Sequence, residues 1–253
     1  MTRLAANIIS TLPSAVQKIA FDLARHLRVD LLGIPDPMDD LRKLSKQSMP
    51  SAILDIGAHH GQTVAALRKH FTKTPIHCFE PFPDSFRQLQ RNVEVDPSTF
   101  CHEVALSNQN GYVDFHSNIN SQTNSILEND KGNIENIESS LTLKKTTVSS
   151  RTLDSFYSEK INLDNLFIKA DVQGAELLLI QGATEVLSQH TNVFLCEASL
   201  APLYKEQADL FSIHNLLCNE LSFDLFQIYR TRSDKNGKAL WCDAAWVKRG
   251  FFT

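Results

Sequence analysis

Two carboxylates and two glycines stand at positions where neighbouring strands of a sheet could bring them together. Asp55, Gly57 and Gly61 lie in the run Asp-Ile-Gly-Ala-His-His-Gly directly after an apolar segment, and Glu80 closes the apolar run 76–79. Glycine at 57 lets the backbone turn tightly and approach a ligand, because it has no Cβ to clash. The helix expected from residue 61 offers unpaired N–H groups, and a carboxylate at 80 can accept two hydrogen bonds from a ribose diol. These residue types predict a site for a nucleotide-type cofactor.

The glycine spacing distinguishes between cofactor classes. The dinucleotide fingerprint is G-x-G-x-x-G, whereas three residues separate Gly57 from Gly61 in this chain. S-adenosylmethionine has no phosphate, so its site does not need the phosphate-binding glycines. The D-x-G-x-x-x-G form therefore favours S-adenosylmethionine over NAD.

A second turn rich in carboxylates follows the apolar run 166–170. It reads Asp171-Val-Gln-Gly-Ala-Glu176 and continues as an amphipathic helix. We expect Asp171 at the carboxyl end of the fourth strand, beside Gly57, at the switch point where open α/β sheets bind ligands.

From residue 51 onward, strand-like and helix-like segments alternate. Strands are expected at 52–56, 76–80, 101–105, 166–171, 192–197, 223–229 and 240–247, and helices at 61–71, 83–94, 152–158, 174–188 and 208–221. This alternation predicts an α/β fold with a mostly parallel sheet covered by helices on both faces. The loop 231–238 between the last two strands is short and contains Asn-Gly, which predicts a final antiparallel hairpin.

Two segments fall outside this alternation. Residues 1–50 are expected to form a helical extension, with one amphipathic helix over 14–33 and a shorter one capped by Asp36 with Pro37 at its first position. The extension is expected to pack on the edge of the main domain, with a substrate lid or a dimerisation arm of a homo-oligomer as alternatives. The segment 116–147 is rich in Asn and Ser, and we interpret it as a long polar loop facing the substrate, with disorder as the alternative.

Composition excludes some classes of protein. With 253 residues and 42% hydrophobic content, the chain suffices for one α/β domain and a small extension. The net charge of −4 gives no strong signal for a nucleic acid, although it leaves a local basic patch open. Five cysteines without a C-x-x-C pair are typical of the reducing cytoplasm. No segment approaches the roughly 20 apolar residues of a membrane span, and residues 1–20 make a poor signal peptide.

Five motifs together resemble the FkbM-type S-adenosylmethionine-dependent methyltransferases. They are Asp55-Ile-Gly-Ala-His-His-Gly61, Phe79-Glu-Pro-Phe-Pro83, Ala105-Leu-Ser107, Arg151-Thr-Leu-Asp154 and Ile168-Lys-Ala-Asp-Val-Gln-Gly-Ala-Glu176. The resemblance implies a class I methyltransferase (Rossmann-like) fold over 51–253, with a seven-stranded, mostly parallel sheet ending in an antiparallel hairpin. It also implies methylation of a hydroxyl on a sugar, a glycan or a glycosylated secondary metabolite. His59 and His60 depart from the commoner family pattern, which has Asn-x there.

The motifs also assign the expected cofactor contacts. Asp55 is expected to order the turn or bind the methionine amine, Glu80 to bind the ribose, and Phe82 to lie over the adenine. The remaining contacts are expected from residues around the same strand ends, namely Gly57, Ala58, Gly61, Pro81, Ala105, Leu106, Asp171, Gln173 and Glu176. Ala105 and Leu106 are placed at the end of the third strand, along the edge of the adenine.

Asp171 is the first candidate for a catalytic residue. A hydroxyl is a poor nucleophile and benefits from a general base within hydrogen-bond reach. The alternative is that Asp171 binds the methionine ammonium or caps the following helix. Glu197, at the end of the fifth strand, is a candidate second acid, and His59 is a candidate for proton transfer. Two histidines with Asp171 or Glu197 could assemble a divalent-metal site, but no spacing demands a metal ion, so none is expected.

Four other functions stay open. An N-methyltransferase usually carries an Asn- or Asp-Pro-Pro-aromatic turn, where this chain has Asp171-Val-Gln-Gly174. An RNA ribose methyltransferase commonly uses Lys-Asp-Lys-Glu, which Lys169, Asp171 and Glu197 match in part. An NAD-dependent oxidoreductase would need a different glycine spacing, and a non-catalytic cofactor-binding scaffold is the fourth option.

Overall fold

The computed structural model describes residues 35–130, 142–161, 163–229 and 231–252. The helix expected over 14–33 lies outside this part of the chain. The first described element, α3 (Pro37–Leu44), is the short helix expected after Asp36. The carboxylate of Asp36 accepts hydrogen bonds from the backbone N–H groups of Met38 and Asp39, at 2.9 and 3.2 Å. Asp36 therefore caps the helix as the sequence predicts.

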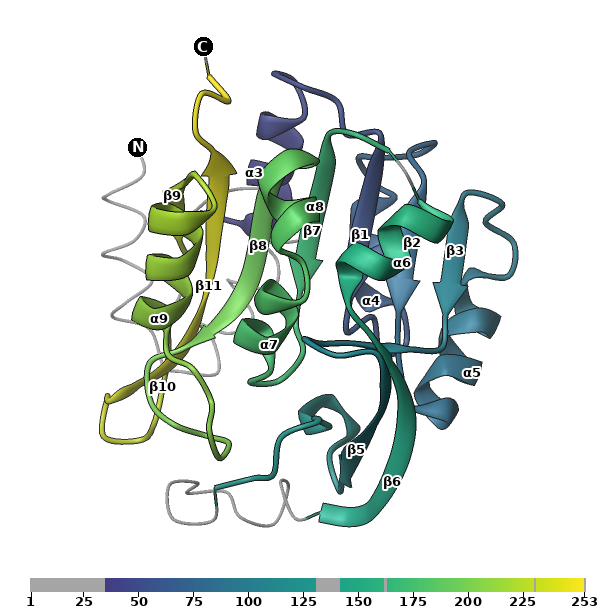
Figure 1. Cartoon of the computed structure of the whole chain (residues 1–253), viewed down its shortest axis with the longest axis vertical. Helices are drawn as coiled ribbons and strands as arrows, with labels where there is room; N and C mark the ends of the chain where they lie inside the picture. Colours follow the sequence, from purple (N-terminus) through teal and green to yellow (C-terminus); the bar gives the residue numbers. More distant parts are fainter. Residues whose placement is uncertain (1–34, 131–141, 162, 230, 253) are drawn as a thin grey trace, which may run out of the picture.

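A mostly parallel sheet forms the centre of the fold (Figure 1). Its strands are β1 (Ala52–Ile56), β2 (Ile76–Phe79), β3 (Thr99–His102), β7 (Leu166–Ala170), β8 (Thr191–Ser199), β9 (Phe223–Ile228), β10 (Arg232–Ser233) and β11 (Ala239–Lys248). The order is β10-β11-β8-β7-β1-β2-β3, and β9 also pairs with β11. Strands β3, β2, β1, β7 and β8 are parallel, whereas β11 is antiparallel to β8, β9 and β10. The expected parallel sheet with a terminal hairpin is confirmed, but β10 forms within the expected loop and makes an eighth strand.

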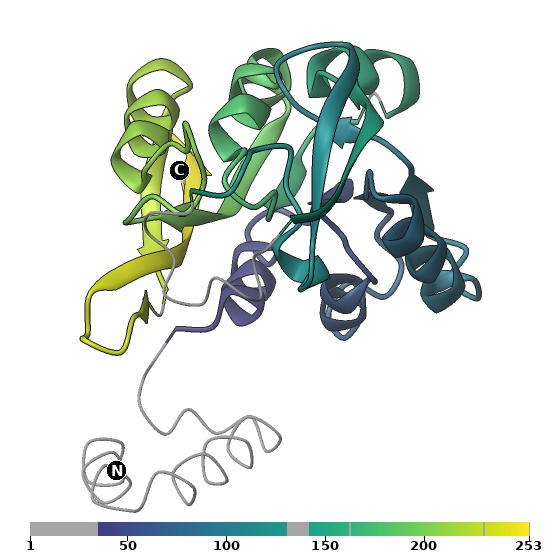
Figure 2. The same cartoon turned by 90° about the horizontal axis from the view of Figure 1, so that it is seen from below.

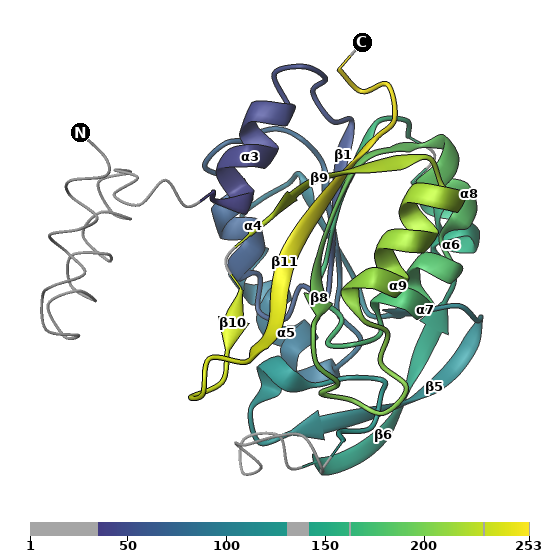
Figure 3. The same cartoon turned by 90° about the vertical axis from the view of Figure 1, so that its left-hand side faces the viewer.

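Helices cover both faces of this sheet, as Figure 3 shows. One face carries α3, α4 (Gln62–Leu67) and α5 (Pro83–Val93), and the other carries α6 (Leu153–Lys160), α7 (Glu176–Gln181), α8 (Thr184–Gln189) and α9 (Leu210–Asn215). Successive residues of β1 point to opposite faces, so Ile53 is buried with the first set and Leu54 with the second. Both side chains are at most 1% exposed. This burial on both faces explains why β1 reads as a continuous apolar run.

The prediction of one long helix over 174–188 is wrong, because Gly182 separates α7 from α8. A Cβ at Gly182 would lie 1.9 Å from the carbonyl oxygen of Ser107. The chain therefore needs glycine where it passes the backbone of Ser107. The helix expected over 208–221 changes at Leu216 into one π turn (Leu216–Glu220).

A second, small sheet lies below the carboxyl edge of the main sheet in Figure 1, and Figure 2 shows it from below. It consists of β4 (Ala105–Leu106), β5 (Gly111–Asn118) and β6 (Thr142–Arg151), in the order β4-β6-β5. Ala105 and Leu106 thus do not end the third strand, because β3 stops at His102. The segment 116–147 is also not all loop, since its two ends belong to the β5–β6 pair.

Among the described residues, no helix is both long enough and apolar enough to cross a membrane.

Candidate active site at the carboxyl edge of the sheet

The turns after β1 and β7 touch each other at the centre of the sheet edge. The backbone N–H of Asp171 donates to the carbonyl of Ile56 at 2.9 Å. Gly57 has φ +80°, and a Cβ there would lie 1.9 Å from the carbonyl oxygen of Asp171. Any side chain at 57 would therefore push the two strand ends apart. The contact between the turns is therefore enough to require glycine at position 57.

A cavity of about 940 Å³ opens beside this contact. Its walls come from the turns after β1, β2 and β7, from the polar segment after β5, and from the segments that follow β8 and β10. Ten of the fourteen predicted site residues line it, namely Gly57, Ala58, His59, Glu80, Pro81, Ala105, Leu106, Asp171, Gln173 and Glu197. This volume lies at the upper end of the range for small-molecule sites, which suits a cofactor together with a second ligand.

Glu80 is a buried carboxylate in the wall of the cavity. It is only 5% exposed, and its two oxygens accept the backbone N–H groups of His59 and Phe82, both at 2.9 Å. Burial raises the pKa of Glu80 to about 7, although the two N–H groups act against this shift. A carboxylate has about four acceptor sites, so two remain after these bonds. Glu80 can therefore still accept hydrogen bonds from a diol.

Asp55 lies beneath the cavity rather than in its wall. Its side chain is 0% exposed, and its oxygen Oδ1 lies 3.4 Å from Nζ of Lys169, which also lies 3.6 Å from Oδ2 of Asp171. Burial raises the pKa of Asp55, and Lys169 opposes the shift. Burial would lower the pKa of Lys169, but the two carboxylates raise it overall. The structure thus makes Asp55 the partner that holds Lys169 next to Asp171, and it gives no contact between Asp55 and the cavity.

Three further predicted residues stay out of the cavity wall. Gly61 has φ +87° and is the N-cap residue of α4. The ring of Phe82 stacks on Phe115, with centroids 5.8 Å apart. The buried carboxylate of Glu176 accepts the backbone N–H of Val172 at 3.0 Å, so it supports the turn from below.

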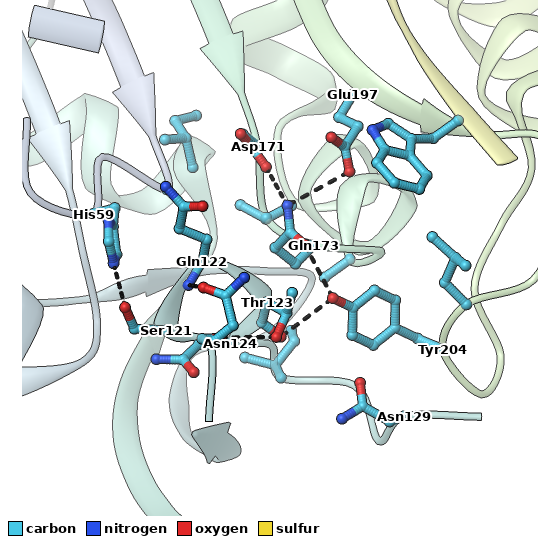
Figure 4. A pocket seen from close by; sticks show the side chains of 18 of the residues that line it. His59, Ser121, Gln122, Thr123, Asn124, Asn129, Asp171, Gln173, Glu197 and Tyr204 are labelled. Carbon is cyan, nitrogen blue, oxygen red and sulfur yellow. Dashed lines mark hydrogen bonds between the residues drawn. The ribbon is translucent and has the colours of Figure 1, made fainter. Parts of the chain in front are cut away.

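On the opposite side of the cavity, Gln173 connects two carboxylates (Figure 4). Its Nε2 lies 2.6 Å from Oδ1 of Asp171 and 3.5 Å from Oε1 of Glu197. Burial and the charges of Asp171 and Glu176 raise the pKa of Glu197 to about 9. Asp171 and Glu197 therefore face one cavity as a partly exposed carboxylate and a more strongly desolvated one.

The polar segment after β5 forms the far wall. Residues 120–124 line the cavity and include a short 3-10 helix (Ser121–Thr123). The hydroxyl of Ser121 lies 2.9 Å from Nε2 of His59, and the hydroxyl of Ser125 donates to the carbonyl of Gln173 at 2.7 Å. The segment is thus tied to both turns. That it faces the substrate stays a prediction.

Sequence reasoning missed several residues of this wall. Tyr204 and Trp241 line the cavity, and Tyr204 bonds to the side chain of Gln173. Neither residue belongs to a motif, and only packing brings them to the site. Ser121 and Asn129 lie in a segment that was recognised only by its composition.

Among the described residues, no group of three or more His, Cys, Asp or Glu side chains is arranged to hold a metal ion.

The lining suits S-adenosylmethionine better than a dinucleotide. Glu80 offers free acceptor sites, and Phe79, Val104 and Leu106 add an apolar wall beside it. The turn after β1 carries no phosphate-binding glycine set. The residues present therefore fit a ligand with a ribose, a flat ring and no phosphate.

A parallel sheet with one reversed strand, and a ligand cavity at its switch point, defines the class I methyltransferase fold. The model of the Methyltransferase FkbM domain matches residues 55–225. The 2-O-methyltransferase NoeI of Sinorhizobium fredii (strain NBRC 101917 / NGR234) is 30% identical over 197 residues, which cover 75% of this chain and 74% of that protein. The crystal structure of methyltransferase FkbM from Methylobacillus flagellatus KT matches with a TM-score of 0.52 at 17% identity. That match covers 78% of this chain and 43% of the larger one, and it shows the shared fold.

The chain belongs to the FkbM family and is an S-adenosylmethionine-dependent methyltransferase.

Proposed function

We propose that this protein transfers the methyl group of S-adenosylmethionine to a hydroxyl of a sugar, a glycan or a glycosylated small molecule. The observation that carries the proposal is the position of Asp171, which faces a wall of side-chain amides and aromatic rings across one cavity. The wall consists of Asn120, Gln122, Asn124, Asn129, Tyr204 and Trp241. The relative NoeI is a 2-O-methyltransferase, which supports transfer to oxygen.

The amide wall suits an acceptor with several hydroxyls. The side-chain oxygens of Asn120 and Asn124 accept backbone N–H groups within their own segment, at 3.1 and 2.7 Å. Their NH₂ groups then act as donors to an acceptor's oxygens. The ring of Trp241 adds a flat apolar surface of the kind that packs against the C–H face of a sugar. This combination favours a neutral, polyhydroxylated acceptor.

The geometry also supports a chemical role for Asp171. When bound, the sulfonium supplies an activated methyl group for an in-line displacement, which requires the acceptor oxygen to be aligned with it. Asp171 would accept the proton of that hydroxyl as the new O–CH₃ bond forms. Lys169 would balance the charge of Asp171, because its Nζ lies 3.6 Å away. Glu80 and the apolar wall beside it would hold the ribose and the adenine.

The proposal is tested first by ligand binding and then by acceptor screening. Calorimetry should show binding of S-adenosylhomocysteine and no binding of NAD. Purified protein should then methylate a saccharide acceptor in a panel that also contains RNA oligonucleotides and amines, and mass spectrometry with NMR should locate the methyl group on oxygen. Binding of NAD in place of S-adenosylhomocysteine, or methylation of RNA or nitrogen alone, would contradict the proposal.

The role of Asp171 has its own test. Asp171→Asn keeps the shape of the side chain but removes the base, so we expect turnover to be lost while the affinity for S-adenosylhomocysteine stays within about tenfold, or about 1.4 kcal/mol. A fully active variant would remove Asp171 from this role.

A further inference from the structure

The side chain of Gln173 lies between two carboxylates and a tyrosine. Its NH₂ group has two hydrogens, and its Nε2 lies 2.6 Å from Asp171 and 3.5 Å from Glu197. Its Oε1 lies 3.0 Å from the hydroxyl of Tyr204. Both ends of the amide, Nε2 and Oε1, therefore have hydrogen-bond partners, as Figure 4 shows.

The backbone at Gln173 is in an unusual conformation for this type of residue. Its φ is +53°, in the left-handed region that residues with side chains seldom adopt. The next residue, Gly174, has φ +97°, and a Cβ there would lie 2.8 Å from the ring of Tyr204. The turn thus places the Gln173 side chain in the cavity and leaves room for the tyrosine ring directly beneath it. Strained positions of this kind cluster at functional sites.

Tyr204 contacts the oxygen end of the Gln173 amide through its hydroxyl. Its hydroxyl lies 3.2 Å from the carbonyl oxygen of Thr123 and 3.0 Å from Oε1 of Gln173, and both atoms are acceptors. The single hydroxyl proton can serve either of them. When it is donated to Oε1 of Gln173, it holds this oxygen away from the carboxylates. If the amide turned over, Oε1 would lie against the carboxylate of Asp171, and two acceptors would repel each other. Tyr204 is only 6% exposed, so its ring is well fixed by packing.

We propose that Tyr204 is a positioning residue for methyl transfer: its hydroxyl orients the amide of Gln173, and this amide holds Asp171 toward the acceptor and apart from Glu197. The inference rests on the proposed function, because it concerns the residue that we propose as the base. Tyr204 itself touches neither Asp171 nor Glu197 through a hydrogen bond that the described residues show. Its effect is therefore transmitted by Gln173.

The pH dependence of the rate reports on this arrangement. An N–H donor to a carboxylate favours the charged form, so loss of the ordered amide makes the reacting carboxylate easier to protonate. Other charged groups also act on Asp171, and they come from every element around it: Asp55 of β1, His59 of the first turn, Lys169 of β7, Glu176 of α7, Glu197 of β8 and Asp243 of β11. A variant at 204 leaves all of these in place. A shift of the profile can then be attributed to the amide.

The test compares Tyr204→Phe with Tyr229→Phe. Tyr229 is a matched control because it is also buried and its hydroxyl contacts a carboxylate, that of Asp40 at 3.3 Å, but it does not line the cavity. For Tyr204→Phe we expect kcat to fall about tenfold and the acid limb of the pH–rate profile to move up by about half a pH unit or more. We expect affinity for S-adenosylhomocysteine, measured by calorimetry, to stay within about threefold. Tyr229→Phe should keep the profile of the wild type.

A second variant distinguishes the positioning role of Tyr204 from a loss of activity caused by misfolding. Gln173→Met keeps the length of the side chain and removes the amide, so it should shift the profile in the same direction. The double variant with Tyr204→Phe should then add little, because the two residues act through one amide. Superimposable profiles for Tyr204→Phe and the wild type, or fully additive losses in the double variant, would overturn the inference.

The two proposals fail in different ways. If Asp171→Asn retains full activity, the base assignment fails and the positioning role fails with it. If Asp171→Asn is inactive but Tyr204→Phe has the rate and the profile of the wild type, only the positioning role fails.

Discussion

Nε2 of His59 lies 2.9 Å from the hydroxyl of Ser121, and this contact joins the turn after β1 to the polar segment across the cavity. His59 also donates its backbone N–H to Glu80 at 2.9 Å. One residue therefore contacts the group proposed to bind the ribose and the wall proposed to bind the acceptor. Burial, together with the neighbouring ring of His60, lowers the pKa of His59, so the neutral imidazole is favoured in this position.

Breaking this contact should weaken acceptor binding more than cofactor binding. His59 has φ +48°, which Asn tolerates better than most residues, so His59→Asn removes the contact with little backbone cost. We expect the KM for the acceptor to rise about fivefold in His59→Asn and in Ser121→Ala, with S-adenosylhomocysteine affinity within about threefold. The double variant should resemble either single variant. Equal losses for acceptor and cofactor would show that the contact does not act in this way.

Gly57→Ala should disrupt the centre of the sheet edge. A Cβ there meets the carbonyl of Asp171, whereas one at Gly237, which has a similar φ of +86°, meets nothing within 4 Å. Both alanine variants carry the cost of a positive φ, so their difference isolates the clash. We expect Gly57→Ala to be less stable than Gly237→Ala by roughly 2 kcal/mol or more in denaturant unfolding. Equal stabilities would mean that the two turns separate without cost.

Glu197 should make stability depend on pH in a defined direction. Its pKa is raised from 4.5 to about 9 in the folded protein, mainly by burial. The folded state therefore keeps a proton that the unfolded state loses, and the free energy of unfolding should fall as the pH rises from 4.5 toward 9. Each pH unit in this window costs at most about 1.4 kcal/mol for one proton.

Glu197→Gln removes this proton and serves as the comparison. The variant should gain stability relative to the wild type as the pH rises, and urea unfolding at several pH values measures the difference. Glu80 has a raised pKa as well, but it is present in both proteins and cancels. A difference that does not change with pH would contradict the assignment.

Trp241 should contribute to acceptor binding without affecting the cofactor. It lines the cavity next to Leu240, at the start of β11. We expect Trp241→Ala to raise the KM for a saccharide about tenfold, because the flat apolar surface is lost, and to leave S-adenosylhomocysteine binding within about threefold. Tyr112→Ala is the control, since that ring is 76% exposed and lies outside this cavity. An unchanged KM in Trp241→Ala would exclude the ring from the acceptor site.

Local sequence determined the backbone of this site. Strand residues followed by Gly57 or by Gln173-Gly174 predict tight turns at strand ends, because only certain residues adopt positive φ without large strain. The alternation of strands and helices predicts the parallel sheet, and parallel strands place those turns at one edge. The fold, the glycine turn and the position of Asp171 beside it could therefore be predicted from residues close together in the chain.

Tertiary structure decided which side chains reach the cavity. Asp55 and Asp171 each open a motif, yet Asp55 lies inside β1 and is 0% exposed beneath Lys169, whereas Asp171 follows β7 and is 37% exposed at the cavity. Tyr204 and Ser121 reach the site from segments without a motif, through hydrogen bonds to Gln173 and His59. Such contacts depend on how distant segments pack and on which buried polar groups must be satisfied. Residue type and spacing determine where the turns form. The packing of the folded chain determines which distant side chains bond to them.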